Sequence, residues 1–258
     1  MQDLKIAMIQ SQLHWEDIDP NLTMFGDKIK AIKEPVDIIV LPEMFSTGFS
    51  MKPEGIAEQF PGKALMWMTD MAREMDCVIT GSIMTEEEGH YYNRLIWMQP
   101  TGSFSIYNKR HLFSMAGEEK VYTPGSTKLV ETIKGWKICP MVCYDLRFPV
   151  WIRNVEEYDA LIFVANWPEK RIQQWRKLLQ ARAIENQCFV VGLNRVGKDG
   201  NDFNYTGSSM AVDTQGEIMA EIGNEEKAEF VTLNHESLEL TRRYMPFLAD
   251  MDGFEIKT

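Results

Sequence analysis

The sequence predicts a layered α/β fold with mixed sheets and with helices on the outer faces. Short apolar runs alternate with segments in which apolar residues recur every three or four positions, the pattern of strands alternating with amphipathic helices. In the middle and late parts of the chain, paired apolar runs flank turn residues, which predicts antiparallel hairpins. Because alternating strands and helices favour parallel pairing and hairpins favour antiparallel pairing, the sheets should be mixed.

The first half of the chain predicts three strands and two helices in alternation, followed by a hairpin. The expected strands are residues 5–12 (KIAMIQSQ), 36–43 (VDIIVLPE) and 77–84 (CVITGSIM). The apolar face of the first helix is Leu22, Phe25, Ile29 and Ile32. The apolar face of the second is Leu65, Met68, Met71 or Ala72, and Met75. The hairpin is expected in residues 94–113, around the turn at Gly102.

The second half predicts three more strands, one long helix and a closing hairpin. The expected strands are residues 136–143 (WKICPMVC), 159–168 (DALIFVANWP) and 188–194 (CFVVGLN). The helix should run from Glu169 to Gln187, and its apolar residues are Ile172, Trp175, Leu179 and Ala183. The closing hairpin is residues 207–223, and a short helical stretch follows Val231. No linker and no fixed repeat divides the chain, so we expect one domain over residues 1–258.

Composition and charge narrow the classes of function. The chain is 45% apolar, enough for a substantial core, and it carries 38 acidic against 27 basic side chains. The formal net charge of −11 disfavours binding to nucleic acid or to anionic lipid. Residues 1–15 show neither a signal-peptide core nor a membrane-spanning length. We therefore expect a small-molecule partner or a second copy of the chain, and no nucleic acid or membrane.

Cysteines and histidines predict neither a disulfide framework nor a metal site. The four cysteines, Cys77, Cys139, Cys143 and Cys188, follow no disulfide or C-x-x-C pattern, which indicates reduced thiols in a cytoplasmic enzyme. The four histidines show no paired spacing of the kind that zinc or iron sites use. No glycine-rich phosphate-binding motif is present, so we expect no metal and no cofactor.

Three apolar runs end in residues that together suggest catalysis. Glu43 follows IIVLP, Lys109 follows FSIYN, and Cys143 follows KICPMV. Ligands of α/β proteins bind beyond strand ends, so these side chains are candidates for one site. A carboxylate can take the proton of a thiol, and an ammonium can stabilise a thiolate or a tetrahedral oxyanion. Taken singly, the three residues are equally compatible with strand-end solvation, a surface lysine and a core cysteine.

Two other interpretations of this pattern stay open. In the first, the chain is a Cys-His hydrolase in which His111 is the base and Lys109 takes no part. In the second, the fold is a binding module that holds a small amide without converting it. Cys139, four residues before Cys143, is expected to be a core residue.

Five sequence blocks resemble the signature of the nitrilase superfamily of carbon–nitrogen hydrolases, and they occur in the family's order. They are LPEMFSTGF, YNKRHLF, VCYDLRFP, ANWP and ARAIENQCFVVGLNRVG. The words KRHLFSMAGE and CYDLRFPVWIRN resemble the omega-amidase branch in particular. The resemblance implies a four-layer α-β-β-α sandwich with mixed sheets. It also implies hydrolysis of the terminal amide of small keto-acid amides such as 2-oxoglutaramate and 2-oxosuccinamate.

Residue by residue, the resemblance assigns Glu43 as general base, Lys109 as cationic stabiliser and Cys143 as nucleophile. The family has a second glutamate upstream of a Pro-Gly turn, and the spacing here favours Glu118 over Glu119.

Substrate-binding candidates surround these residues in the sequence. The backbone N–H of Tyr144 can help to bind an oxyanion, Asn166 and Trp167 match the family's pocket rim, and Phe113 can line a compact pocket. Phe45 is a second aromatic candidate for the lining, and Asp145 and Arg147 are expected to support the cysteine turn. The cation that meets a substrate carboxylate is left open among Arg110, Arg147, Lys170 and Arg171.

The end of the chain predicts self-association. Beyond the helical stretch after Val231 come Tyr244, Met245, Phe247 and Leu248, which a monomer would leave partly exposed. The resemblance implies that subunits pair through helix faces and C-terminal segments. We therefore expect a homodimer in which the segment from about residue 232 makes contacts.

Overall fold

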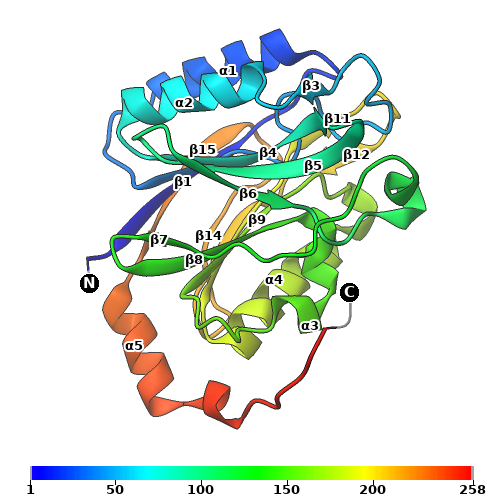
Figure 1. Ribbon diagram of the computed structural model, residues 1–258. Coiled ribbons are helices and arrows are strands. Elements are labelled where there is room, and N and C mark those ends of the chain that lie inside the picture. The colour runs from blue at the N-terminus through cyan, green and yellow to red at the C-terminus, as the bar shows by residue number, and fades with distance from the viewer. Residues whose placement is uncertain (1, 257–258) are drawn as a thin grey trace.

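Two sheets stack face to face, and helices cover the outer face of each, in the computed structural model of the protein, which describes residues 2–256 (Figure 1). The four layers in order are helix, sheet, sheet and helix. Both sheets contain parallel and antiparallel pairs. The prediction of an α-β-β-α sandwich with mixed sheets is therefore confirmed.

The first sheet is built from the N-terminal half of the chain and one late strand. Its strands are β1 (Leu4–Gln10), β2 (Ile38–Val40), β3 (Glu58–Gln59), β4 (Val78–Glu87), β5 (His90–Met98), β6 (Phe104–Asn108) and β15 (Lys227–Leu233). The strand order is β15-β1-β2-β4-β5-β6, with β3 pairing β4. The parallel trio β1, β2 and β4 lies at the centre. The helices α1 (Ile18–Lys30) and α2 (Lys63–Met75) cover its outer face (Figure 1).

The second sheet repeats this plan. Its strands are β7 (Glu131–Ile133), β8 (Trp136–Val142), β9 (Ala160–Val164), β10 (Phe189–Leu193), β13 (Met210–Val212) and β14 (Ile218–Glu221). The order is β14-β13-β10-β9-β8-β7, with a parallel trio of β8, β9 and β10. The helices of this half are α3 (Pro149–Ile152) and α4 (Ile172–Asn186). A separate ribbon pairs β11 (Val196–Lys198) with β12 (Asn204–Thr206), and α5 (His235–Tyr244) follows β15.

The central strands are buried on both faces, which explains their unbroken apolar runs. In β1, Ile6 and Met8 belong to the core between the two sheets, whereas Ala7 and Ile9 pack in the core beneath α1 and α2. The predicted stripe on α2 packs as expected, since Leu65, Met68, Met71 and Ala72 are buried. Cys139 is fully buried in the core between the sheets, so the prediction that it is a core residue is confirmed.

The topology brings four strand ends to the same edge of the sandwich. Glu43 lies three residues after the end of β2, Lys109 follows β6 directly, and Cys143 follows β8 directly. Asn166 lies two residues after the end of β9. These segments are far apart in the sequence, and only the stacking of the two sheets brings them together.

Several strands were not anticipated from the sequence. The strand β15 pairs antiparallel with the whole of β1, from Leu4–Leu233 to Gln10–Lys227. Its segment KAEFVTL carries charged residues at exposed positions of an edge strand, which weakens the apolar signal. The short strands β3, β7, β11 and β12 have two or three residues each, too few to show a periodicity.

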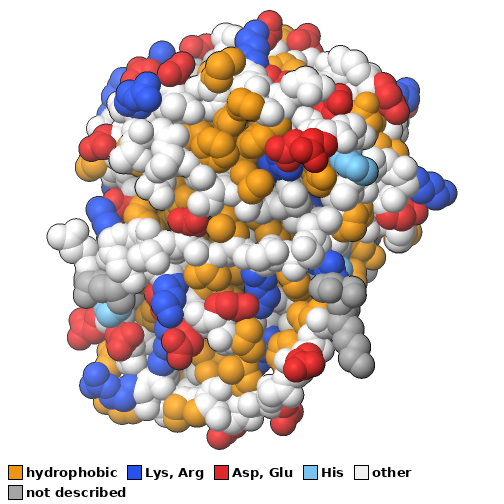
Figure 2. Space-filling view, viewed as in Figure 1, with side chains coloured by type: hydrophobic (Ala, Val, Ile, Leu, Met, Phe, Trp, Pro, Cys, Tyr) orange, Lys and Arg blue, Asp and Glu red, His pale blue; other side chains and the backbone are white. Residues whose placement is uncertain are grey.

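On the face shown in Figure 2, acidic and basic side chains are interspersed and do not gather into one basic patch. Within residues 2–256, no helix combines the length and the apolarity needed to cross a membrane.

Gly192 in β10 provides a test of how α4 packs on the second sheet. A Cβ at this position would lie 2.5 Å from Leu179 Cδ1 and 2.8 Å from Trp175 Cζ2. Gly192→Ala should therefore overpack this contact and lower the free energy of unfolding by about 1–3 kcal/mol in urea titrations. Gly253→Ala is the matched control, because nothing lies within 4 Å of its added Cβ. Equal unfolding midpoints for the two variants would contradict this packing.

Candidate active site

A buried ammonium between two buried carboxylates forms the centre of the site. Lys109 Nζ lies 2.8 Å from Glu43 Oε1 and 2.8 Å from Glu118 Oε2, and all three side chains are fully buried. Lys109 Nζ also donates to Glu118 Oε1 at 3.0 Å. The three groups therefore form one hydrogen-bonded cluster from which water is excluded.

Glu43 is fixed by groups from both sheets. Asn93 in β5 donates to Glu43 Oε1 at 2.8 Å, and the backbone N–H of Asn166 donates to Oε2 at 2.8 Å. Asn93 is itself oriented by the hydroxyl of Ser82 in β4, which donates to its side-chain oxygen at 2.8 Å. The Ser82 hydroxyl in turn accepts from the backbone N–H of Met44 at 2.8 Å.

Glu118 closes the cluster from a loop. The backbone N–H of Phe113 donates to Glu118 Oε2 at 2.5 Å, and Asn93 donates to Oε1 at 3.2 Å. The neighbouring Glu119 is exposed. Of the two glutamates considered from the sequence, the structure therefore places Glu118 against Lys109.

The two carboxylates differ in their tendency to ionise. Burial raises the pKa of Glu43, but the Lys109 charge and the hydrogen bonds from Lys109, Asn166 and Asn93 outweigh burial and hold this pKa below its usual value. Burial raises the pKa of Glu118 above its usual value despite Lys109, and the negative charge of Glu43 adds to the increase. Glu43 is therefore the carboxylate that stays ionised and free to accept a proton, whereas Glu118 is the first to hold one.

Lys109 stays charged. Burial lowers its pKa, but Glu118, Glu43 and Cys143 together hold it above the ordinary value for lysine. The same charges act on the thiol. Burial and the charge of Glu43 raise the pKa of Cys143 well above its ordinary value, against the opposing effect of Lys109.

Cys143 occupies a strained turn at the end of β8. Its φ of 44° lies in the left-handed region that few non-glycine residues adopt. Asp145 supports this turn: its Oδ2 accepts from the backbone N–H of Val142 at 3.1 Å and from the Tyr107 hydroxyl at 2.8 Å. The expectation that Asp145 supports the cysteine turn is therefore confirmed.

His111 contacts Asp145 and Phe148. Its Nδ1 lies 2.8 Å from Asp145 Oδ1, and its ring stacks on Phe148 with centroids 3.7 Å apart. The structure thus places His111 against Asp145 and Lys109 against Glu43 and Glu118. This geometry does not favour the Cys-His interpretation.

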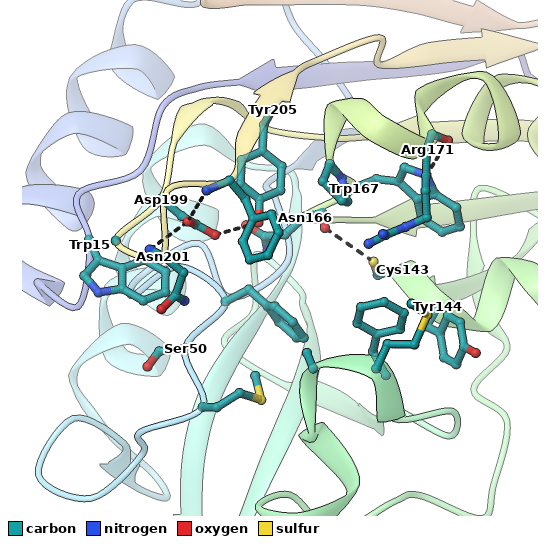
Figure 3. Close-up of a pocket in the computed structure, with 18 of the residues that line it drawn as sticks. Trp15, Ser50, Cys143, Tyr144, Asn166, Trp167, Arg171, Asp199, Asn201 and Tyr205 are labelled. Atoms are coloured by element: carbon teal, nitrogen blue, oxygen red, sulfur yellow. Dashed lines mark hydrogen bonds between the residues drawn. The ribbon is translucent and has the colours of Figure 1, made fainter.

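A cavity of about 620 Å³ opens above the sulfur (Figure 3). Of the residues named from the sequence, Cys143, Tyr144, Asn166, Trp167 and Phe113 line it. Glu43, Lys109 and Glu118 lie behind this lining, and Cys143 is 9% exposed. The sulfur is therefore part of the cavity lining, whereas the charged cluster next to the sulfur is not.

The cavity also presents cations. Arg147, Lys170 and Arg171 line it, with Arg147 over the Trp167 ring at 4.8 Å and Arg171 over the Phe113 ring at 5.1 Å. Arg110 does not line it and instead donates to the Gly125 carbonyl at 3.0 Å. Three of the four cations considered from the sequence are therefore placed to meet an anionic substrate.

Some residues differ from expectation. Phe45 packs in the core against Phe25, with centroids 5.6 Å apart, and is not part of the cavity lining. Arg147, expected to support the cysteine turn, lines the cavity instead. Asn93 and Ser82 were missed, because a polar residue inside a strand gives the same pattern as one that faces solvent. Within residues 2–256, no three His, Cys, Asp or Glu side chains are grouped to hold a metal ion.

Comparison with known proteins identifies the family of the chain and several relatives. The carbon–nitrogen hydrolase family profile matches residues 5–243. The chain is 40% identical over 257 residues to the omega-amidase YafV of Escherichia coli K12, covering 99% of this chain and 100% of the relative. It is 30% identical over 226 residues to the 2-oxoglutaramate amidase of Bacillus subtilis, covering 86% of this chain and 87% of that one.

A solved structure has the same fold over the full length of both chains. The crystal structure of XC1258 from Xanthomonas campestris, a CN-hydrolase superfamily protein with an arsenic adduct in its active site, superposes with a TM-score of 0.97. The two chains are 38% identical, and the match covers 100% of both.

Glu118→Gln should lower kcat/KM by about a hundredfold or more, because it removes a charge-assisted partner of Lys109 inside a buried cluster. Glu119→Gln is the matched control and should keep the wild-type rate, since Glu119 is exposed. Ammonia release assayed on both variants checks this prediction. A loss confined to Glu119→Gln would show that the second glutamate had been misassigned.

Proposed function

The chain belongs to the carbon–nitrogen hydrolase family, and we propose that it hydrolyses the terminal amide of small keto-acid mono-amides such as 2-oxoglutaramate and 2-oxosuccinamate. The products are the dicarboxylic acid and ammonia. That the chain is an amidohydrolase follows from the family and from its omega-amidase relatives. The substrate class and the thioester route below are our proposal.

The observation that carries the proposal is the combination of a nucleophile and cations on one cavity. Cys143 is positioned to attack an amide carbon, while Arg147, Lys170 and Arg171 are positioned to bind a carboxylate. A keto-acid mono-amide carries both groups on a short chain. The relatives named omega-amidase and 2-oxoglutaramate amidase support this choice of substrate.

The first half of the proposed reaction makes a thioester. The Cys143 thiol proton passes to Glu43 as the sulfur attacks the amide carbon, and the carbonyl electron pair moves to oxygen. The Lys109 ammonium and the backbone N–H of Tyr144 stabilise this oxyanion. The proton on Glu43 then passes to the amide nitrogen, the C–N bond breaks as the carbonyl re-forms, and ammonia leaves.

The second half hydrolyses the thioester. Glu43 takes a proton from a water molecule, whose oxygen attacks the thioester carbon. The C–S bond then breaks, the sulfur recovers a proton from Glu43, and the dicarboxylic acid is released. Glu118 remains bound to Lys109 throughout and holds the ammonium in place.

The test is an acyl adduct on Cys143. Brief exposure to keto-acid amides should add the acyl mass to the wild-type protein, and intact-mass spectrometry should find none on Cys143→Ala. A panel of short mono-amides, nitriles and carbamoyl compounds identifies the substrate class. Preference for a carbamoyl compound would favour a carbamoyl hydrolase. A binding module would give neither adduct nor ammonia with any compound.

Glu43→Gln should lower the single-turnover rate of acylation by about a hundredfold or more, the usual scale for loss of a general base. The effect is expected because the raised pKa of Cys143 keeps the sulfur protonated until Glu43 takes its proton. Rapid quench followed by mass spectrometry measures the rate. Adduct formation at the wild-type rate would show that Glu43 is not the base.

We also propose that the chain forms a homodimer through its C-terminal segment. Tyr244 and Phe247 are 77% and 55% exposed, and Met245 beside them is 36% exposed. Light scattering should therefore give the mass of two chains, and the double variant Tyr244→Glu and Phe247→Glu should give the mass of one. Met66→Glu, at a 61% exposed apolar residue of α2, is the control and should leave the dimer intact. A wild-type mass of one chain at micromolar concentration would contradict the proposal.

A further inference from the structure

Asn166 carries one buried acceptor that has no hydrogen-bond partner among the residues the structure describes. Its backbone N–H donates to Glu43 Oε2, and its side-chain nitrogen donates to the Glu43 carbonyl at 2.7 Å and to Oε2 at 3.3 Å. Its side-chain oxygen Oδ1 is buried, and no donor within residues 2–256 lies within hydrogen-bond distance of it. Asn166 therefore uses its donors on Glu43 and keeps Oδ1 unpaired.

The orientation of the amide follows from these contacts. The side-chain nitrogen faces two oxygens of Glu43, a carbonyl and a carboxylate, both of which only accept hydrogen bonds. Rotation of the amide by half a turn would set its oxygen against both of them. Oδ1 is thus the atom left without a partner, and this holds as long as Glu43 is ionised.

The residue that carries this acceptor lies beside the nucleophile. Asn166 lines the cavity and is 5% exposed, and its backbone carbonyl lies 3.9 Å from Cys143 Sγ (Figure 3). A buried acceptor without a donor is unfavourable, and a bound donor recovers that free energy. The cavity at this point therefore favours a ligand that brings an N–H or O–H group close to the sulfur.

We propose that Asn166 Oδ1 accepts a hydrogen bond from the N–H of the scissile amide and thereby selects amides over esters. The inference rests on the proposed function, since it takes Cys143 to be the nucleophile. A primary amide has two N–H donors on the atom that leaves, whereas the leaving oxygen of a methyl ester has none. The bond strengthens as the reaction proceeds, because the nitrogen gains a proton and positive character before it departs.

Asn166 also braces Glu43, so its replacement affects the base as well as the acceptor. The two roles separate when the substrate is changed together with the residue. Loss of the brace slows the attack on every substrate, because Glu43 removes the thiol proton in each case. Loss of the acceptor slows only substrates whose leaving group carries an N–H.

The experiment measures kcat/KM for 2-oxoglutaramate and for the matching ω-methyl ester, which forms the same acyl-enzyme. Asn166→Ala removes the acceptor and the side-chain donors to Glu43 and keeps the backbone N–H bond, so both rates should fall. The ratio of amide to ester rate should fall by about tenfold or more. Asn166→Asp keeps an acceptor oxygen and loses only the side-chain N–H donors to Glu43. It should lower both rates and keep the wild-type ratio.

If Asn166→Ala lowers the amide and ester rates by the same factor, the inference is wrong and Asn166 acts only by holding Glu43 in place. A lower ratio of amide to ester rate in Asn166→Asp than in the wild type would also overturn the inference. If circular dichroism shows that Asn166→Ala is unfolded, Asn166→Asp alone provides the test. Wild-type protein that converts neither substrate would instead refute the proposed function, and the inference with it. The two failures are therefore distinguishable on the wild-type protein.

Discussion

A lysine ammonium without access to water is the constraint around which this protein is arranged. Lys109 is fully buried, and Glu43 and Glu118 balance its charge. Removing such charges from water is unfavourable by several kcal/mol for each ion unless the geometry of their partners is close to ideal. The cluster therefore requires every group that contacts it to be held by rigid structure.

That rigidity comes from hydrogen-bond donors on three separate segments of the chain. Asn93 lies within a strand of the first sheet, Asn166 follows a strand of the second, and the Phe113 loop supplies a backbone N–H to Glu118. Neither sheet contains the whole cluster. The stacking of the sheets, driven by the apolar core between them, is therefore also what assembles the charged centre.

Burial raises the pKa of the Cys143 thiol, and the cluster adds to this because it carries one more negative than positive charge when both glutamates are ionised. Burial, Glu43 and Glu118 raise the pKa of Cys143, while Lys109 and the hydrogen bond to the Asn166 backbone lower it. A neutral sulfur beside an ionised carboxylate can receive help from that carboxylate only during the attack. The left-handed turn at Cys143 fixes the sulfur at the cavity for this purpose.

The sequence predicted the layered fold and the strand ends because these features produce local signals. Strongly apolar runs mark the buried strands, and a polar residue directly after such a run marks Glu43, Lys109 and Cys143. Asn93 could not be found this way, because its role depends on a partner fifty positions away. The strand β15 was missed for a related reason: its pairing with β1 is a contact between the two ends of the chain.

Glu43, Lys109 and Glu118 lie behind the residues that line the cavity, and this separation has an evolutionary consequence. The cavity wall includes loop residues such as Asn201 and Phe203, which form no hydrogen bond with the charged cluster. Mutations in these loops can reshape the cavity without disturbing the buried ions. New substrate preferences can therefore arise by small steps in such a scaffold, while the chemistry that breaks the carbon–nitrogen bond is inherited unchanged.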